Sequence, residues 1–290
     1  MNAIFFHFHK KNIFKNIIIY DYPKKGIKLH KKPTLLISGI IILNFLIFNI
    51  IHLNIYENLN FKPSLILVIL STIFFLIGFV DDYKKLSPIK KSLLILFSLI
   101  IFLPLENIFI VRSLALYNDR LIIDLNDGAI FFTILCIYLL FNFYNFIDGT
   151  NGVAISVALY WLLFNYMYGD YLNCLILSIS ICLLFILILN LLGKIFLGNA
   201  GTNILSIFIS ILFIANYNLS NIEIDQIILV MLLPFIDSLR ITVSRLIQNK
   251  SPFIGDLNHY HHLLELIIPK KYVFLLYLLI SILPFLINNY

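Results

Sequence analysis

The chain has 290 residues, of which 61% are hydrophobic and 12% are charged, and its formal net charge is +6. Soluble globular domains carry about 25% charged residues, so this composition excludes an ordinary soluble domain. The apolar residues come in runs of about 20, the length that crosses a bilayer as a helix. The chain is therefore predicted to be an integral membrane protein.

Nine membrane-spanning helices are predicted after a basic cytoplasmic N-terminal segment, residues 1–33. Residues 34–290 are expected to form a single transmembrane domain, an all-α polytopic helical bundle whose cytoplasmic loops form a site. The three cysteines lie within spans without Cys-x-x-Cys spacing, which argues against a disulfide framework or a thiolate metal site. The spans are placed at 34–53, 63–80, 90–105, 128–147, 152–169, 171–192, 200–218, 225–243 and 272–289.

The orientation follows from Lys and Arg, which are enriched in cytoplasmic loops. With the N-terminus inside, only Lys62, Arg112 and Arg120 of the 21 Lys and Arg residues fall outside, which leaves 18 inside. Topology and anionic lipid at the inner leaflet then explain the positive charge. No nucleic-acid-binding motif accompanies it, so nucleic acid is not expected as a partner.

Four polar clusters occur at the ends of these spans, all on the inner side. Ionisable side chains are costly at membrane depth, so their recurrence at one face suggests a site. The orientation rests on Lys and Arg alone, so this convergence supports an inner-face site independently. The clusters lie at residues 81–82, 145–152, 198–201 and 237–262.

Asp81 and Asp82 form an adjacent carboxylate pair after the second span. Two such groups can share Mg²⁺, or one can bind the metal while the other accepts a proton, because neighbouring like charges raise one pKa. Two solvated acids that cap a helix are the alternative interpretation. At a membrane boundary that faces other polar clusters, the site interpretation is favoured.

Asn145 and Asp148 offer hard oxygen ligands at the end of the fourth span, and Gly149 and Gly152 after them permit a sharp turn. A plain helix C-terminus stopped by Gly and Asn is the alternative interpretation. The turn at 198–201 could cradle phosphate oxygens at the start of the seventh span, although an ordinary interhelical turn is favoured there.

Three histidines, His259, His261 and His262, lie within four positions after the eighth span, and Arg240 and Arg245 precede them. Imidazole and guanidinium donors together can bind a diphosphate. Zinc is the alternative ligand, but no Cys lies nearby and the His-Glu-x-x-His arrangement is missing from this stretch. A loop without a role is the third interpretation, and phosphate contact is favoured.

The outer loop between the third and fourth spans holds Asn118-Asp119 between two strand-like stretches. This pattern predicts a small hairpin over residues 110–124 on the outer surface.

Five motifs follow one another along the chain: Asp-Asp-x-x-x-Leu-Ser-Pro, Asn-x-x-Asn-x-x-Asp-Gly-x-Asn-Gly, Phe-Leu-Gly-x-x-Gly, Asp-x-x-Arg and Asp-x-x-His-x-His-His. In this order they resemble the polyprenyl-phosphate N-acetylhexosamine-1-phosphate transferases, in particular the WecA-like branch of glycosyltransferase family 4, which is related to the MraY transferases. Asp21-x-Pro23 and Lys28-Leu29-His30-x-x-Pro33 look like the first cytoplasmic loop of that family. The resemblance runs from about residue 21 to residue 264.

The resemblance implies an enzyme that transfers a sugar 1-phosphate from a UDP-N-acetylhexosamine to undecaprenyl or another polyprenyl phosphate and releases UMP, with Mg²⁺ or alternatively Mn²⁺. It implies a bacterial inner (cytoplasmic) membrane protein whose N-terminus and active site are cytoplasmic. Its product would begin a cell-surface polysaccharide of the cell wall or the lipopolysaccharide O-antigen. A homodimer is compatible with this interpretation.

The resemblance also suggests roles for single residues. Asp81 and Asp82 match a pair tied to the lipid phosphate and to catalysis, and Asp148 is assigned to catalysis with them at the nucleotide pocket. Asn145 and Asn199 match metal-contacting positions. Substrate binding is assigned to Lys91, Asn151, Arg245, His259, His261 and His262.

Position 199 departs from the family pattern, because Asn199 stands where the Phe-x-Gly-Asp motif has a metal-contacting carboxylate. An amide oxygen can coordinate Mg²⁺, but the lost charge predicts weaker binding of the ion. A catalytically silent membrane homologue that binds a lipid or a partner is therefore the alternative function. A transporter would carry charges near the midplane of broken helices, and the sequence shows no such pattern.

Overall fold

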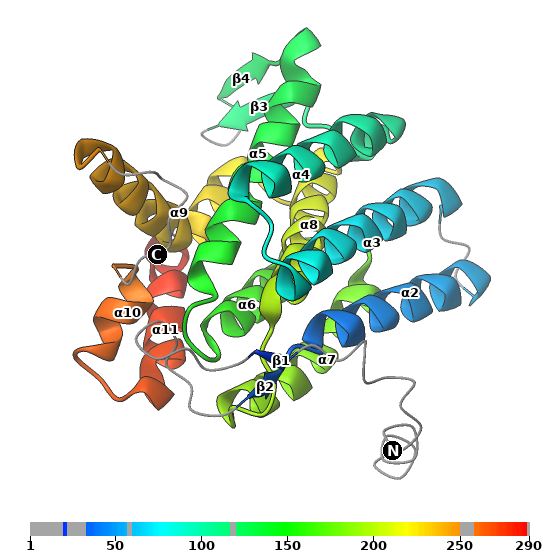
Figure 1. The fold of residues 1–290 in the computed structure, drawn as a ribbon. Coiled ribbons are helices and arrows are strands. Elements are labelled where there is room, and N and C mark those ends of the chain that lie inside the picture. The colour runs from blue at the N-terminus through cyan, green and yellow to red at the C-terminus, as the bar shows by residue number, and fades with distance from the viewer. Residues whose placement is uncertain (1–19, 22–32, 57–59, 117–119, 250–257, 289–290) are drawn as a thin grey trace.

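A computed structural model describes residues 20–21, 33–56, 60–116, 120–249 and 258–288, which form a helical bundle with two short antiparallel strand pairs (Figure 1). The helices are α2 (Ser38–Tyr56), α3 (Phe61–Tyr83), α4 (Pro88–Phe102), α5 (Ala129–Ile147), α6 (Val153–Tyr168), α7 (Asn173–Leu191), α8 (Gly198–Asn218), α9 (Ile224–Ile247), α10 (Tyr260–Glu265) and α11 (Lys270–Asn288).

The nine longer helices match the nine predicted spans. Eight of them, in the described part of the chain, are long and apolar enough to cross a membrane when α4 is extended to Leu105, and α6 is a shorter apolar helix of 16 residues. The prediction of an all-α polytopic membrane bundle is confirmed. Helix α2, which matches the first predicted span, begins at Ser38 instead of residue 34, because β2 (Thr34–Leu35) pairs with β1 (Tyr20–Asp21) before the helix starts.

Helix α8 lies at the centre of the bundle (Figure 1), and 89% of an apolar 18-residue stretch of this helix is buried. Two glycines allow neighbouring helices to approach its first turn closely. A Cβ on Gly78 of α3 would lie 2.4 Å from the Asn199 carbonyl oxygen, and one on Gly39 of α2 would lie 2.7 Å from the Ala200 Cβ. The absence of these side chains therefore fixes the start of α8 against α2 and α3.

The end of the bundle at which α3, α5 and α7 finish and α4, α6 and α8 begin is called the site end below. The segment before α8 is fastened there to the segment before α2. Phe196 N–H donates to the Leu35 carbonyl at 2.9 Å, and Ser38 Oγ donates to the Phe196 carbonyl at 2.8 Å. A parallel bridge also joins Leu35 to Ile195. The start of α8 is thus held by backbone as well as by helix packing.

The opposite end carries an antiparallel hairpin of β3 (Ser113–Leu116) and β4 (Leu121–Asp124), with Ser113 opposite Asp124. The predicted hairpin over residues 110–124 is confirmed. The strands follow η1 (Leu103–Leu105) and η2 (Asn107–Phe109), and η3 (Asn126–Gly128) leads from the hairpin into α5.

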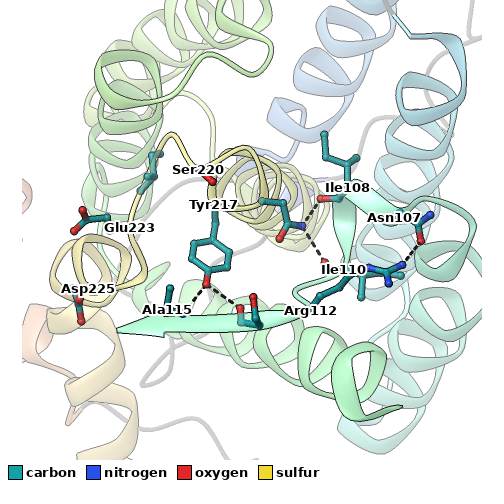
Figure 2. Close-up of a pocket in the computed structure, with 12 residues that line it drawn as sticks. Asn107, Ile108, Ile110, Arg112, Ala115, Tyr217, Ser220, Glu223 and Asp225 are labelled. Carbon is teal, nitrogen blue, oxygen red and sulfur yellow. Dashed lines mark hydrogen bonds between the residues drawn. The ribbon is translucent and has the colours of Figure 1, made fainter. Parts of the chain in front are cut away.

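Tyr217, near the end of α8, fastens this hairpin (Figure 2). Its hydroxyl accepts the Ala115 N–H at 2.9 Å and donates to the Ser113 carbonyl at 2.8 Å. Asn218 Nδ2 donates to the Ile110 carbonyl at 3.0 Å beside it. A cavity of about 540 Å³ opens next to these contacts. Since none of the predicted site residues lines this cavity, it is separate from the predicted site.

Candidate active site

The carboxylate cluster, defined as Asp81, Asp82, Lys91, Asn145 and Asn199, assembles at the site end from α3, α4, α5 and α8. Lys91 Nζ lies 3.0 Å from Asp81 Oδ2 and donates to Asn199 Oδ1 at 2.8 Å. Lys91 and Asn199 are 108 residues apart in the chain. The structure therefore brings together residues that the sequence could place only on one side of the membrane.

Asp82 accepts hydrogen bonds from the first turn of α8. Its Oδ1 accepts the Asn199 backbone N–H at 3.0 Å and Asn199 Nδ2 at 2.9 Å, and its Oδ2 accepts the Ala200 N–H at 3.0 Å. The first N–H groups of a helix lack partners within the helix and favour an anion. The start of α8, considered from sequence as a phosphate cradle, thus holds the carboxylate of Asp82.

Asp81 is held by the turn that follows α3. Its Oδ1 accepts the Leu86 N–H at 2.8 Å, while its other oxygen meets Lys91. Ser87 then caps α4, because its Oγ accepts the Lys90 N–H at 3.4 Å, and Pro88 occupies the first helical position, where its missing N–H costs nothing. The Leu-Ser-Pro part of the first motif therefore turns the chain so that α4 presents Lys91 to Asp81.

Asn145, on the last turn of α5, reaches the cluster through Thr202 of α8. Thr202 Oγ1 lies 2.9 Å from Asn145 Oδ1 and 3.2 Å from the Asn199 carbonyl oxygen, so one hydroxyl proton is shared between two acceptors. The sequence analysis missed Thr202. Its position directly after the Phe-Leu-Gly-x-x-Gly motif was the signal that could have found it.

The α5–α6 turn, residues 148–152, follows Asn145. Asp148 lies just beyond the end of α5, and burial together with the charge of Asp82 raises its pKa to about 7. The residue is nevertheless exposed to solvent, so water screens much of this upward shift. Gly152 has φ +84°, a backbone conformation that glycine adopts without strain. The turn therefore places an easily protonated carboxyl group beside the carboxylate cluster.

The histidine cluster, defined as Asp237, His259, His261, His262 and Glu265, lies on α9 and α10. His261 is fully buried and packs against the α5–α6 turn, where a Cβ on Gly149 would come within 2.2 Å of its Nε2. Burial and the neighbouring His262 and His259 lower the pKa of His261 to about 3. Burial also lowers the pKa of His262. This imidazole pair is therefore neutral near pH 7.

Glu265 ties the end of α10 to the same turn. Its Oε1 accepts the Thr150 hydroxyl at 2.6 Å and lies 3.9 Å from His262 Nδ1, while its Oε2 lies 3.2 Å from Lys270 Nζ. The sequence analysis missed Glu265 and Thr150. The spacing of three positions between His262 and Glu265 on one helix was the available signal.

A protein-family model described as glycosyl transferase family 4 matches residues 64–217, more than half of the 290-residue chain. The chain belongs to glycosyl transferase family 4. No curated protein matches it. The family 4 match covers the whole carboxylate cluster and the α5–α6 turn, whereas the histidine cluster follows it. The family-level resemblance found in the sequence is thereby confirmed.

Two further predicted site residues of this family 4 protein, Asn151 and Arg245, lie within the described residues. Asn151 is exposed on the α5–α6 turn. Arg245 is buried on α9, two turns beyond Asp237. Asp256 and the motif from Pro23 to His30 lie outside the described residues.

The carboxylate and amide oxygens of the family 4 site are of the type that binds a hard cation such as Mg²⁺. The described residues contain no group of three or more His, Cys, Asp or Glu side chains that could hold a metal. Carboxylate and amide oxygens do converge, and Mg²⁺ is commonly held by one or two carboxylates together with substrate phosphates. Asn199 Oδ1 faces Lys91, so Asn199 would have to exchange this ammonium group for a cation.

Proposed function

We propose that this chain is a phosphoglycosyltransferase that moves N-acetylhexosamine 1-phosphate from a UDP-sugar to undecaprenyl or another polyprenyl phosphate and releases UMP. The product would serve as the first lipid-linked intermediate of a cell-surface polysaccharide. The proposal puts the site on the cytoplasmic side of the bacterial inner membrane, in agreement with the distribution of Lys and Arg.

One observation carries the proposal. In this chain of glycosyl transferase family 4, the α5–α6 turn lies between the carboxylate cluster and the histidine cluster. Asp148 of this turn is close enough to Asp82 for its pKa to respond, and Gly149 touches His261. Carboxylates with a lysine suit a cation and a lipid phosphate, and imidazoles suit a diphosphate. Both substrates of the proposed reaction thus have fitting groups within one site.

The proposed step is a displacement at phosphorus. An oxygen of the lipid phosphate attacks the phosphorus that bears the sugar, while the bond from that phosphorus to the bridging oxygen breaks and its electron pair leaves with UMP. A lipid phosphate is largely ionised near pH 7, so the protein mainly has to position the reactants and neutralise charge. Lys91 supplies a positive charge next to Asp81 that would offset part of the charge of the lipid phosphate.

Mg²⁺, or Mn²⁺ in its place, is proposed as the cofactor and would neutralise the diphosphate charge in the transition state. Asp81 and Asp148 are the carboxylates that would hold it, with Asn145 as an amide ligand. Asp81 Oδ2 would exchange Lys91 for the ion, whereas both oxygens of Asp82 accept backbone N–H groups at the start of α8, so Asp82 would mainly fix the geometry of the cluster. The histidine cluster would contact the diphosphate on the other side of the turn.

The experiment is UMP release by the purified protein given undecaprenyl phosphate, Mg²⁺ and a panel of UDP-N-acetylhexosamines. The matched control is Asp81→Asn, which keeps the side-chain volume and removes the charge. Release with one donor, at least about 100-fold slower in the control, is the expected result. Equal release by both proteins would contradict the proposed site.

A second candidate rests on Asn199. Its amide oxygen accepts from Lys91 and its amide nitrogen donates to Asp82, so both ends of the side chain are engaged within the protein. A silent homologue that binds a lipid or a partner would fit this arrangement. It predicts no UMP release from any donor by the wild-type protein and measurable release after Asn199→Asp.

A further inference from the structure

Asp237 is a carboxylate with no exposed surface, on an apolar helix, that neither cluster uses for direct substrate contact. Its Oδ1 lies 2.9 Å from Arg240 Nη2, and its Oδ2 lies 3.1 Å from His259 Nδ1. The backbone N–H of Tyr260 lies 3.2 Å from both of its oxygens. A buried charge is costly unless it is paired and hydrogen-bonded in this way, so the contacts account for its presence there.

These contacts determine which ring nitrogen of His259 carries a proton. Arg240 and the Tyr260 N–H can only donate, so the carboxylate that receives them is an acceptor. His259 Nδ1 must therefore donate to Asp237 Oδ2. A neutral imidazole has one N–H, and placing it at Nδ1 leaves Nε2 as the acceptor nitrogen on the opposite side of the ring.

The faces of the same ring are also fixed. The His259 ring lies 5.4 Å from the Phe146 ring on one side, measured between centroids. It stacks on the His261 ring, with 5.6 Å between centroids and 7° between the planes. His259 is only 5% exposed. Two ring contacts and one hydrogen bond thus restrict the orientation of this buried imidazole.

We propose that Asp237 is a positioning residue that holds His259 with its proton on Nδ1 and presents its Nε2, as a hydrogen-bond acceptor, to a hydroxyl group of the UDP-sugar. The inference rests on the proposed function for the identity of the ligand. The orientation of His259 stands on its contacts with Asp237, Phe146 and His261, whatever the ligand. The pair resembles the carboxylate–histidine arrangement in which a carboxylate sets the tautomer of a functional imidazole.

A purely structural role, in which Asp237 only docks α10, makes a different prediction. Helix α10 has a second anchor at its other end, where Glu265 binds Thr150 and Lys270. If docking were the whole role, Glu265→Gln and Asp237→Asn would have similar effects on His259. If Asp237 positions the ring, only Asp237→Asn changes the tautomer.

The first test is the ¹⁵N NMR spectrum of the protein labelled at its histidines, with His259 assigned through His259→Gln. The wild type is expected to show His259 protonated at Nδ1. Asp237→Asn is expected to lose most of that population, because an amide can donate as well as accept, and Glu265→Gln is expected to retain it. An unchanged tautomer in Asp237→Asn, or an equal change in both variants, would overturn the proposal.

The second test separates positioning from substrate affinity. In the UMP-release assay, Asp237→Asn is expected to lower kcat by about 10- to 100-fold with a smaller change in KM for the UDP-sugar, as is typical when an orienting partner is lost. A changed tautomer with unchanged kcat would contradict the positioning role. If the wild type releases no UMP, the proposed function fails, and the NMR result still decides whether Asp237 orients His259.

Discussion

The two clusters at the site end differ in what holds them together. In the carboxylate cluster, the oxygens of Asp82 accept backbone N–H groups from α8, so the ends of two long helices fix the geometry. In the histidine cluster, a six-residue helix is held mainly by side chains, through Asp237 at one end and Glu265 at the other. The first cluster is therefore expected to be tied to bundle stability, and the second to be altered with less effect on the bundle.

Removal of Asp82 should give the largest effect on stability. Asp82→Ala leaves two N–H groups at the start of α8 and the Asn199 amide without their acceptor, a loss of about 2–3 kcal/mol. Thermal unfolding in detergent measures it, with Asp81→Ala as the control, since Asp81 accepts one backbone N–H. Equal melting temperatures for the two variants would show that the carboxylate cluster does not hold α8.

A methyl group on the α5–α6 turn should disturb the histidine cluster more than the bundle. Gly149→Ala would place its Cβ 2.2 Å from Nε2 of the fully buried His261 ring and 2.9 Å from His262 Nε2. We expect UMP release to fall about 10- to 100-fold with little change in melting temperature. Gly128→Ala is the matched control, because a Cβ there meets no atom within 4 Å. Full activity of Gly149→Ala would show that the close contact between Gly149 and His261 is not needed for the reaction.

Acid should loosen α10 selectively. The pKa of His261 is about 3 in the folded protein, against 6.5 for an ordinary histidine, because burial, His262 and His259 lower it more than Asp237 raises it. When α10 opens, the ring binds a proton below pH 6.5 that the docked helix does not bind, so docking weakens as the pH falls from 6.5 toward 3. At pH 5 the loss is about 2 kcal/mol.

Hydrogen exchange of the α10 amides at pH 7 and pH 5, corrected for the intrinsic rates, checks this prediction. His261→Gln should remove most of the pH dependence, since glutamine does not titrate. The amides of α8, which the carboxylate cluster holds, should show no comparable change. A pH response that persists in His261→Gln would assign the effect to another group.

A restored carboxylate at position 199 should give the smallest effect. Asn199→Asp adds a negative charge next to Lys91 and Asp82, and we expect the apparent affinity for Mg²⁺ in the UMP-release assay to rise about tenfold. Asn142→Asp provides a charge control on α5. A Mg²⁺ titration with no gain in Asn199→Asp would count against a metal role for this position.

The sequence predicted the fold well, because apolar runs of about 20 residues leave little choice but membrane helices. The polar clusters at their ends also predicted the site end, and the turn pattern predicted the hairpin. The strand pair before α2 was not predicted, because two-residue strands carry no periodic signal. The match to glycosyl transferase family 4 agrees with the family that the motifs resemble.

The partners of the site residues could not be predicted in the same way. Asp82 and Asn199 are 117 residues apart, and no local pattern says that a carboxylate will accept the first N–H groups of another helix. Thr202 and Glu265 were missed because hydroxyl and carboxyl groups on helices are usually solvated. Their roles depend on which helices pack together, which the sequence of one helix does not contain.

In the proposed reaction, the sugar and the phosphate bonded to it are transferred together to a lipid carrier. The most direct measurement uses a UDP-N-acetylhexosamine labelled with ³²P at the sugar-bearing phosphate, the purified protein and undecaprenyl phosphate, followed by extraction of lipid. Label is expected to enter the lipid fraction as UMP appears, and Asp81→Asn is expected to slow both at least about 100-fold. Label that remains in UDP while the sugar reaches the lipid would contradict the proposed reaction, because the chain would then transfer a sugar without its phosphate.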